Sequence, residues 1–251
     1  MASYPPSDCC TKGFLHDGTP TGSYIELGDS KIKTYVTKPG FKEDRIIVIL
    51  PDVFGIYLPN TLMIADQFAC KSGYTTYIPD ILLNDHIDYS LLIQGKVDIN
   101  TWKLNHTNEI TKPVVEESLK TIKEQNKDKK ICVIGYCFGA KFAVQQLNGK
   151  DGFADVGAIA HPSGVTIEEV AAISKPILFS CAETDELFPM ENLVATIEKL
   201  KENKATYQLD FFSGVSHGFA ARGDPSDKNV KYAKEKVFAD QTHWFDYHLS
   251  N

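Results

Sequence analysis

A cysteine stands between two glycines in the segment GYCFG, residues 135–139. The preceding residues, 131–134, are apolar and β-branched, as in a buried parallel strand, and the following residues are small and apolar at helical spacing. Such a sharp strand-to-helix turn needs glycines, because larger side chains would collide with both elements. The turn would place Cys137 at a helix N-terminus, where the dipole favours a thiolate. Cys137 is therefore a candidate nucleophile; the alternative is a small core residue, as we interpret Cys132.

A nucleophilic cysteine needs a base and an acid, and two later segments supply candidates. Asp185 follows the apolar run 176–182. His217 follows the strand-like run 206–212. Both residues would lie at the carboxyl ends of strands, as Cys137 does. The order nucleophile, acid, histidine, with separations of 48 residues (137 to 185) and 32 residues (185 to 217), is that of the α/β-hydrolases. The joint pattern is far more specific than its parts.

Each candidate partner of the cysteine could have another role or be replaced by a competing residue. Asp185 could cap the helix that follows it, and Glu183 and Glu186 compete for the role of the acid. His217 lies between glycine-containing turns and could face only water. His161 also follows a strand-like run, but it comes before any suitable acid in the chain order. We therefore assign His161 to the pocket wall or to a structural role.

Composition excludes several classes of partner. The chain has 251 residues, 43% hydrophobic and 24% charged, which is enough for a large core in one domain. The net charge is −7 and no cluster of Lys and Arg could track a phosphate backbone, so we expect neither nucleic acid nor an anionic membrane as a partner. No apolar run approaches membrane-spanning length, and the first residues lack the apolar region of a signal peptide. We therefore expect a cytoplasmic protein.

The six cysteines follow no disulfide-like or metal-binding spacing, which favours reduced thiols. Cys9 and Cys10 are adjacent, but no second ligand cluster lies near them in the sequence. We therefore expect no metal site there. We interpret the pair as a polar, mobile N-terminal feature, with redox reactivity as the alternative.

Strand-like and helical segments alternate through most of the chain. Residues 1–23 are rich in Pro, Gly, Ser and Thr and predict an N-terminal arm, and residues 24–251 predict one α/β domain with a doubly wound, mostly parallel sheet. Residues 82–112 show no sustained period and predict an irregular or short-helical cap over the site. Pro113 is expected to begin the helix before the cysteine strand. The expected strands are 24–27, 31–36, 46–50, 74–79, 131–134, 156–160, 176–182 and 206–212.

Four segments together resemble the dienelactone hydrolase (carboxymethylenebutenolidase) family. They are PDVFG (51–55), GYCFGAKFA (135–143), DELFP (185–189) and SHGFAARGD (216–224). The resemblance covers the chain from about residue 24 to its end, and CCTKGFLHDGTPTG (9–22) is similar to the fungal branch of that family. It implies an α/β-hydrolase fold and a cysteine-dependent hydrolase that opens lactone or ester bonds without a metal or organic cofactor.

The resemblance also implies roles for single residues. Cys137 matches the nucleophile and His217 the general base of the family. Asp185 matches the residue that orients the base. The backbone N–H groups of Phe138 and Val53 match the two donors of the oxyanion hole.

Two departures from the family concern charged residues. Where the family has a glutamate that holds and activates the resting cysteine, this sequence has Asp52, which keeps the charge on a shorter side chain. Characterised bacterial members bind a substrate carboxylate with two arginines. One of these is absent here, and Arg222 comes one position later than the family spacing. We expect Asp52, Arg222 and His161 to be substrate-binding or thiol-activating residues.

We therefore expect a hydrolase of small esters or lactones that works through a Cys137-His217-Asp185 triad and a covalent thioester intermediate. Esters are favoured over peptides because a thiolate expels amines poorly. We expect a monomer or homodimer that acts on a small-molecule substrate. The rival hypothesis on the same fold is a thiol-based redox sensor or a catalytically silent binding protein.

Overall fold

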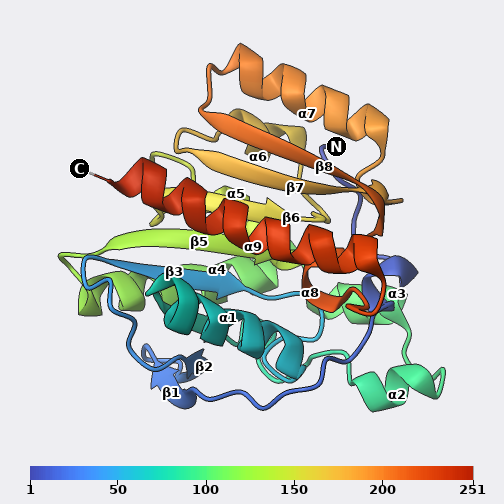
Figure 1. Ribbon diagram of the computed structural model, residues 1–251, viewed down its shortest axis with the longest axis horizontal. Helices are drawn as coiled ribbons and strands as arrows, with labels where there is room; N and C mark the ends of the chain where they lie inside the picture. The colour runs from blue at the N-terminus through green and yellow to red at the C-terminus, as the bar shows by residue number, and fades with distance from the viewer. Residues whose placement is uncertain (251) are drawn as a thin grey trace.

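One sheet of eight strands lies at the centre of the part of the chain that the computed structural model describes, residues 1–250 (Figure 1). The strands are β1 (Ser23–Leu27), β2 (Ile32–Val36), β3 (Arg45–Leu50), β4 (Thr75–Pro79), β5 (Lys130–Tyr136), β6 (Val156–Ala160), β7 (Ile177–Thr184) and β8 (Tyr207–Ser216). Their order is β1-β2-β4-β3-β5-β6-β7-β8. β2 pairs antiparallel with both β1 and β4, and all other pairs are parallel. The predicted α/β-hydrolase fold is confirmed.

Helices cover both faces of this sheet (Figure 1). One face carries α1 (Pro59–Ser72), α8 (Phe219–Arg222) and α9 (Lys228–Leu249). The other face carries α4 (Asn108–Gln125), α5 (Gly139–Gln145), α6 (Ile167–Ala171) and α7 (Met190–Glu202). The remaining short helices are η1 (Asp8–Thr11), α2 (Tyr89–Ile93), α3 (Ile99–Trp102) and η2 (Lys103–Asn105). Among residues 1–250, no helix combines the length and the apolar character needed to cross a membrane.

The central strands are apolar on both sides because helices pack on both faces. In β3 and β5 every residue after the first is buried. The helix after β3 begins with Pro59, whose missing N–H costs nothing at that position, and it ends at Gly73 in the left-handed conformation, with φ 78°. Local signals thus place both ends of α1.

One predicted boundary is wrong. α4 begins at Asn108 and contains Pro113 within the helix, whereas the sequence predicted a start at Pro113. The proline leaves the carbonyl of Glu109 without its helical donor, and this residue is exposed, so water can take the donor's place.

The segment 82–112 has the predicted short-helical character. It contains α2, α3 and η2. Trp102 Nε1 donates to the backbone oxygen of Asp85 at 2.7 Å, and the Trp102 ring lies 5.3 Å from the ring of Phe138, centroid to centroid. This part of the segment therefore packs against the residue that follows Cys137.

The N-terminal arm, residues 1–23, is bound to the rest of the molecule through part of its length. The N–H groups of Ser3 and Phe14 donate to carbonyl oxygens of distant segments, at 2.8 and 2.7 Å. Cys9 and Cys10 lie in η1 and are 8% and 0% exposed. The prediction that this pair forms a polar, mobile feature is wrong, because the arm carries both thiols into the apolar core.

Candidate active site

The turn between β5 and α5 has the geometry predicted for a nucleophile elbow. Cys137 has φ +50°, an uncommon conformation for a residue with a side chain. A Cβ atom on Gly139 would overlap the carbonyl oxygen of Leu50 in the neighbouring β3. One on Gly135 would lie 2.5 Å from the Cα of Ala140. Glycines at both positions allow the helix to approach the sheet this closely.

Three side chains that follow three different strands meet at the carboxyl edge of the sheet. Cys137 follows β5, Asp185 follows β7 and His217 follows β8. His217 Nε2 lies 3.1 Å from Cys137 Sγ. His217 Nδ1 lies 2.9 and 3.0 Å from the two carboxylate oxygens of Asp185. The three residues are 0–7% exposed, and their arrangement is that of a nucleophile, a base and the acid that orients the base.

The acid side chain is held by its own turn as well as by the histidine. Oδ1 of Asp185 also accepts hydrogen bonds from the N–H groups of Leu187 (2.9 Å) and Phe188 (3.1 Å). The capping role considered as an alternative therefore occurs together with the histidine contact. The competing Glu183 instead accepts from the N–H of Gly214 at 2.7 Å.

A second cysteine, Cys10 of the N-terminal arm, contacts the Cys-His pair. Its Sγ lies 3.2 Å from Cys137 Sγ and 3.6 Å from His217 Nε2. Ser163 Oγ lies 3.8 Å from Cys137 Sγ. Sequence reasoning missed the Ser163 contact and considered a contact of the Cys9-Cys10 pair with Cys137 only within the redox-sensor hypothesis. Ser163 could have been found from its place after the strand-like run 156–160, whereas Cys10 is 127 residues from Cys137 and has no periodic pattern around it.

The charges around Cys137 favour a thiolate paired with an imidazolium. Burial would raise the pKa of the Cys137 thiol. The hydrogen bond from Cys10 and the positive charges of His217 and Arg222 outweigh burial and hold this pKa well below its ordinary value. Burial would lower the pKa of His217, but the Cys137 charge and the Asp185 hydrogen bond raise it to about 10. The groups that stabilise the thiolate thus include two that the elbow pattern alone did not reveal, Cys10 and Arg222.

Asp52 and Arg222 bond to each other. Arg222 Nη1 donates to Asp52 Oδ2 in an ion pair whose side chains are each 1% exposed. Asp52 Oδ1 accepts from the N–H of Phe54 at 3.0 Å, and Arg222 Nε donates to the backbone oxygen of Lys12 at 3.0 Å. Burial raises the pKa of the Asp52 carboxyl, and the Arg222 charge opposes this shift. Asp52 therefore fixes the guanidinium whose charge favours the thiolate.

Two backbone N–H groups near Cys137 have no acceptor. They belong to Val53, in the loop after β3, and to Phe138, directly after Cys137; these residues are 0% and 5% exposed. Among residues 1–250, neither N–H donates a hydrogen bond to the protein. Buried, unpaired donors in the turns that follow two adjacent strands suit a negatively charged oxygen.

His161 follows β6 and lies beside the triad. Its ring centroid is 5.2 Å from that of His217 and 6.0 Å from that of Tyr136. It is fully buried, and within residues 1–250 neither ring nitrogen has a hydrogen-bond partner. Burial, reinforced by the charges of His217 and Arg222, holds the pKa of His161 well below its ordinary value, so the ring is neutral. This position fits a wall residue better than a second base.

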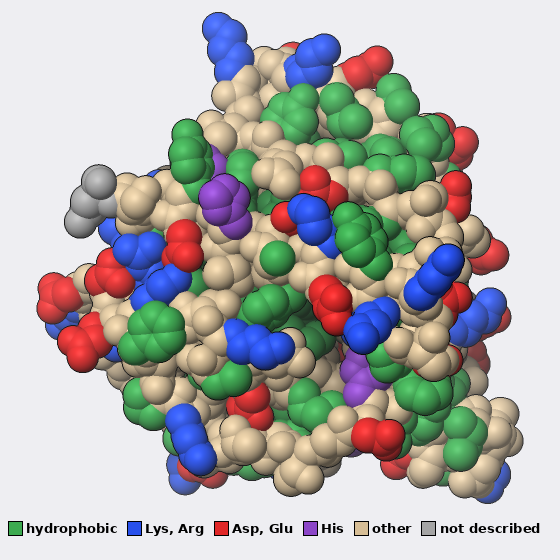
Figure 2. Space-filling view, viewed as in Figure 1, with side chains coloured by type: hydrophobic (Ala, Val, Ile, Leu, Met, Phe, Trp, Pro, Cys, Tyr) green, Lys and Arg blue, Asp and Glu red, His purple; other side chains and the backbone are tan. Residues whose placement is uncertain are grey.

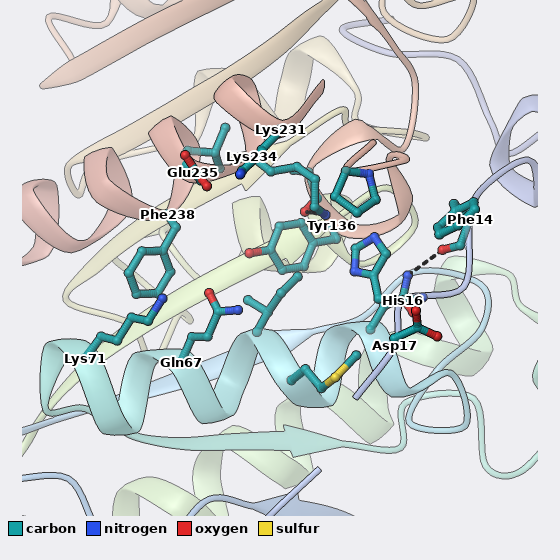
Figure 3. Close-up of a pocket in the computed structure, with 16 residues that line it drawn as sticks. Phe14, His16, Asp17, Gln67, Lys71, Tyr136, Lys231, Lys234, Glu235 and Phe238 are labelled. Atoms are coloured by element: carbon teal, nitrogen blue, oxygen red, sulfur yellow. Dashed lines mark hydrogen bonds between the residues drawn. The ribbon is translucent and has the colours of Figure 1, made fainter. Parts of the chain in front are cut away.

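A cavity of about 560 Å³ lies between α1 and α9. Figure 2 shows a hollow on this face, with apolar side chains at its floor and charged ones around it. Figure 3 shows Gln67 of α1 opposite Lys234 of α9, with the Tyr136 ring between them. Burial, together with the Arg222 charge, lowers the pKa of Lys234 to about 7. Tyr136 precedes Cys137, but no triad residue lines this cavity, so it is separate from the Cys-His pair.

The family model and the curated relatives identify the family of the chain. The model of the dienelactone hydrolase family matches residues 32–249. Hydrolase tropI of Talaromyces stipitatus is 36% identical over 258 residues, covering 99% of each chain. Dienlactone hydrolase 1 of Gibberella moniliformis is 36% identical over 254 residues, covering 98% of this chain and 95% of the relative. A structure from Klebsiella pneumoniae, described as a candidate dienelactone hydrolase, has a TM-score of 0.73 at 12% identity, covers 91% of this chain and 99% of that chain, and supports the fold alone.

Proposed function

The chain belongs to the dienelactone hydrolase family and is an ester or lactone hydrolase, and from this premise we propose that Cys137 is its nucleophile. The resemblance found in four sequence segments is thereby confirmed. The observation that carries the proposal is the 3.1 Å distance between His217 Nε2 and Cys137 Sγ, with Asp185 on the other ring nitrogen. This geometry supports a resting thiolate–imidazolium pair in which the histidine proton is already in place for a leaving group.

In the first half of the reaction, Sγ of Cys137 attacks the ester carbonyl carbon. A carbon–sulfur bond forms and the carbonyl electron pair moves onto oxygen, where the N–H groups of Val53 and Phe138 stabilise it. The oxyanion then collapses and the ester C–O bond breaks. The leaving alkoxide takes the Nε2 proton of His217, which leaves a thioester and a neutral imidazole.

In the second half, His217 removes a proton from water, and the hydroxide attacks the thioester carbonyl. The carbon–sulfur bond breaks, the acid product leaves and Cys137 returns as a thiolate. The proton stays on His217, so the resting pair is restored and the net reaction is ester plus water to acid plus alcohol. Asp185 keeps the Nδ1 proton facing its carboxylate throughout.

The surroundings support small, uncharged esters or lactones as substrates. The guanidinium of Arg222 already donates to Asp52 and to the backbone oxygen of Lys12. One cation that is paired in this way attracts a substrate carboxylate less than a free pair of arginines would. Apolar side chains of Val53, Phe54, Leu82, Trp102 and Phe138 are in the same core cluster as Cys137.

A burst experiment tests the proposal. We expect wild-type protein to hydrolyse short-chain p-nitrophenyl esters and lactones. After rapid quenching and digestion, peptide mass spectrometry should show one acyl group on the peptide that contains Cys137. Cys137→Ala should abolish both turnover and the acyl adduct. His217→Ala should lower turnover by about 10²-fold or more, because the general base is lost. Cys70→Ser, at an exposed cysteine, is the matched control and should behave as wild type. Unchanged turnover in Cys137→Ala would overturn the cysteine mechanism.

One contact favours a second candidate function, a peroxide-sensitive thiol. Cys10 Sγ lies 3.2 Å from Cys137 Sγ, and a disulfide needs about 2.05 Å, so a small movement would join them. The Cys137 thiolate would attack a peroxide to give a sulfenic acid and hydroxide. The Cys10 thiol would then displace the sulfenic oxygen, giving a disulfide and water, with two electrons transferred to the peroxide.

Mass spectrometry after mild peroxide treatment tests this candidate. A sensor should give one Cys10–Cys137 disulfide that a thiol reductant reverses, and Cys10→Ser should instead accumulate oxidised Cys137. Sulfinic or sulfonic acid on Cys137 in the wild type, without a disulfide, would contradict it.

A further inference from the structure

Three ligand atoms from two distant parts of the chain converge beside Cys137. Sγ of Cys9, Sγ of Cys10 and a ring nitrogen of His217 all lie within 4.8 Å of one another. Cys137 Sγ adjoins this group, 3.2 Å from Cys10 Sγ and 3.1 Å from His217 Nε2. All four residues are buried, at 0–8% exposed. The proposed mechanism gives the thiol of Cys9 no role and uses that of Cys10 only through its hydrogen bond with Cys137.

The donor set is that of a tetrahedral zinc site. Thiolate and imidazole are the ligands that Zn²⁺ and similar soft or borderline cations prefer. With metal–sulfur bonds of about 2.3 Å and metal–nitrogen bonds of about 2.0 Å, adjacent ligand atoms in a tetrahedron are about 3.8 Å (sulfur–sulfur) and about 3.5 Å (sulfur–nitrogen) apart. The Cys10–His217 separation is 3.6 Å, and the Cys10–Cys137 separation of 3.2 Å needs only a small expansion.

The arm that supplies two of the ligands is already in place. η1 carries Cys9 and Cys10, and the arm is held on both sides of this turn. Before it, Tyr4 N–H donates to the backbone oxygen of Leu187 at 2.7 Å. After it, Phe14 N–H donates to the backbone oxygen of Arg222, also at 2.7 Å. Preorganised ligands of this kind bind a cation without first having to order the chain.

We propose that Cys9, Cys10 and His217, with Cys137 as the fourth ligand, form a binding site for a thiophilic divalent cation such as Zn²⁺, and that its occupation switches the hydrolase off. Binding forms one metal–nitrogen and three metal–sulfur bonds and releases the protons of the ligating thiols and imidazolium to solvent. The cation occupies the attacking sulfur and the proton-carrying nitrogen together. The inhibitory half of this proposal rests on the proposed function; the binding half does not.

The test is a titration of the reduced protein with Cd²⁺ alone, kept in a phosphine reductant so that no disulfide removes the ligands. The ultraviolet thiolate-to-cadmium absorption band should rise to one equivalent. Cys9→Ser and Cys10→Ser should each lose about a third of the band and bind at least about tenfold more weakly, since each removes one of three sulfur ligands. Cys70→Ser should match the wild type. Circular dichroism checks the fold of each variant. If Cys10→Ser is unfolded, the cadmium titration of Cys9→Ser provides the test.

The same samples are assayed for hydrolysis with Zn²⁺. One equivalent should abolish wild-type turnover, a chelator should restore it, and Cys9→Ser should need at least about tenfold more Zn²⁺ for the same inhibition. The site would be overturned by the absence of a cadmium band at one equivalent, or by a band that is unchanged in Cys9→Ser. Full turnover at saturating Zn²⁺ would overturn the inhibition. If the protein shows no ester turnover at all, the proposed function fails, and the cadmium titration still decides the metal site.

Discussion

At Cys137, neighbouring groups act in opposite directions on one thiol proton. Burial favours the neutral thiol. Cys10, His217 and Arg222 favour the thiolate, and their combined effect outweighs that of burial. Arg222 can do so from inside the protein only because Asp52 neutralises it in a buried pair. The sequence identified Asp52 and Arg222 as charged residues of the site, but their mutual contact joins positions 170 residues apart and has no local signature.

In the proposed mechanism, the pH dependence of hydrolysis follows from the His217 imidazolium. Its pKa is raised to about 10, so the proton donor is present at neutral pH and is lost as the pH rises through about 10. We expect kcat/KM for a neutral ester to fall on the alkaline side near pH 10. Asp185→Asn removes one of the groups that raise this pKa and should move the alkaline limb to lower pH.

Glu183→Gln is the matched control for that profile, because Glu183 bonds to the N–H of Gly214 rather than to the histidine. Its alkaline limb should coincide with that of the wild type. A wild-type limb near pH 6.5, the ordinary histidine range, would contradict the imidazolium assignment.

At the scale of elements, the elbow between β5 and α5 depends on close approach. Gly139 begins α5 directly against the Leu50 carbonyl of β3. The strands β3 and β5 are paired in register from Arg45–Lys130 to Leu50–Gly135. This arrangement was predictable, because a glycine-flanked residue between an apolar run and a helical pattern has few other solutions. The path of the N-terminal arm was not predictable, since its tertiary hydrogen bonds follow no period along the sequence.

Gly139→Ala tests the close approach. The added Cβ would overlap backbone rather than a movable side chain, so we expect the free energy of unfolding to fall by about 2–4 kcal/mol. Ester turnover should fall as well, because the elbow must shift. Urea unfolding measures the first effect.

Gly95→Ala is the control for this variant. A Cβ there meets no atom within 4 Å, so only its positive φ of 67° opposes the change, at about 1 kcal/mol. Equal losses of stability in the two variants would argue against a steric requirement at the elbow.

At the scale of the whole molecule, the strand-helix alternation made the sheet, its mostly parallel pairing and the proximity of Cys137, Asp185 and His217 predictable. Each triad residue follows a strand, and parallel strands bring their carboxyl ends to one edge. The burial of the Cys9-Cys10 pair and the cavity between α1 and α9 were not predictable. Both depend on packing between segments far apart in the chain, which a pattern within one segment does not record.

Lys234, at that cavity, makes the stability of the molecule depend on pH. The residue is partly buried, its amine donates to the backbone oxygen of Ala220 at 2.8 Å, and burial with the Arg222 charge lowers its pKa to about 7. The pKa of an unfolded lysine is about 10.4. Between about pH 7 and about pH 10.4, the unfolded chain therefore holds a proton on Lys234 that the folded chain lacks. The resulting cost is fully present below pH 7 and disappears as the pH approaches about 10.4.

Lys234→Met should therefore gain stability relative to the wild type at low pH, and this gain should shrink by up to about 1.4 kcal/mol per pH unit above pH 7. Urea unfolding at several pH values measures the difference. Lys231→Met, at an exposed lysine of the same cavity, is the control and should show no such slope. A difference between Lys234→Met and wild type that is constant with pH would contradict the buried amine.

The thiolate–imidazolium pair is tested most directly by the rate at which iodoacetamide labels Cys137 as a function of pH, read by peptide mass spectrometry. The exposed Cys70 gives a reference curve from the same sample. We predict that the Cys137 rate stays level from neutral pH down to an inflection far below the ordinary cysteine value of about 8.5, and that His217→Ala moves the inflection up towards that value. A wild-type Cys137 rate that rises only through about pH 8.5, as for an ordinary thiol, would contradict the account.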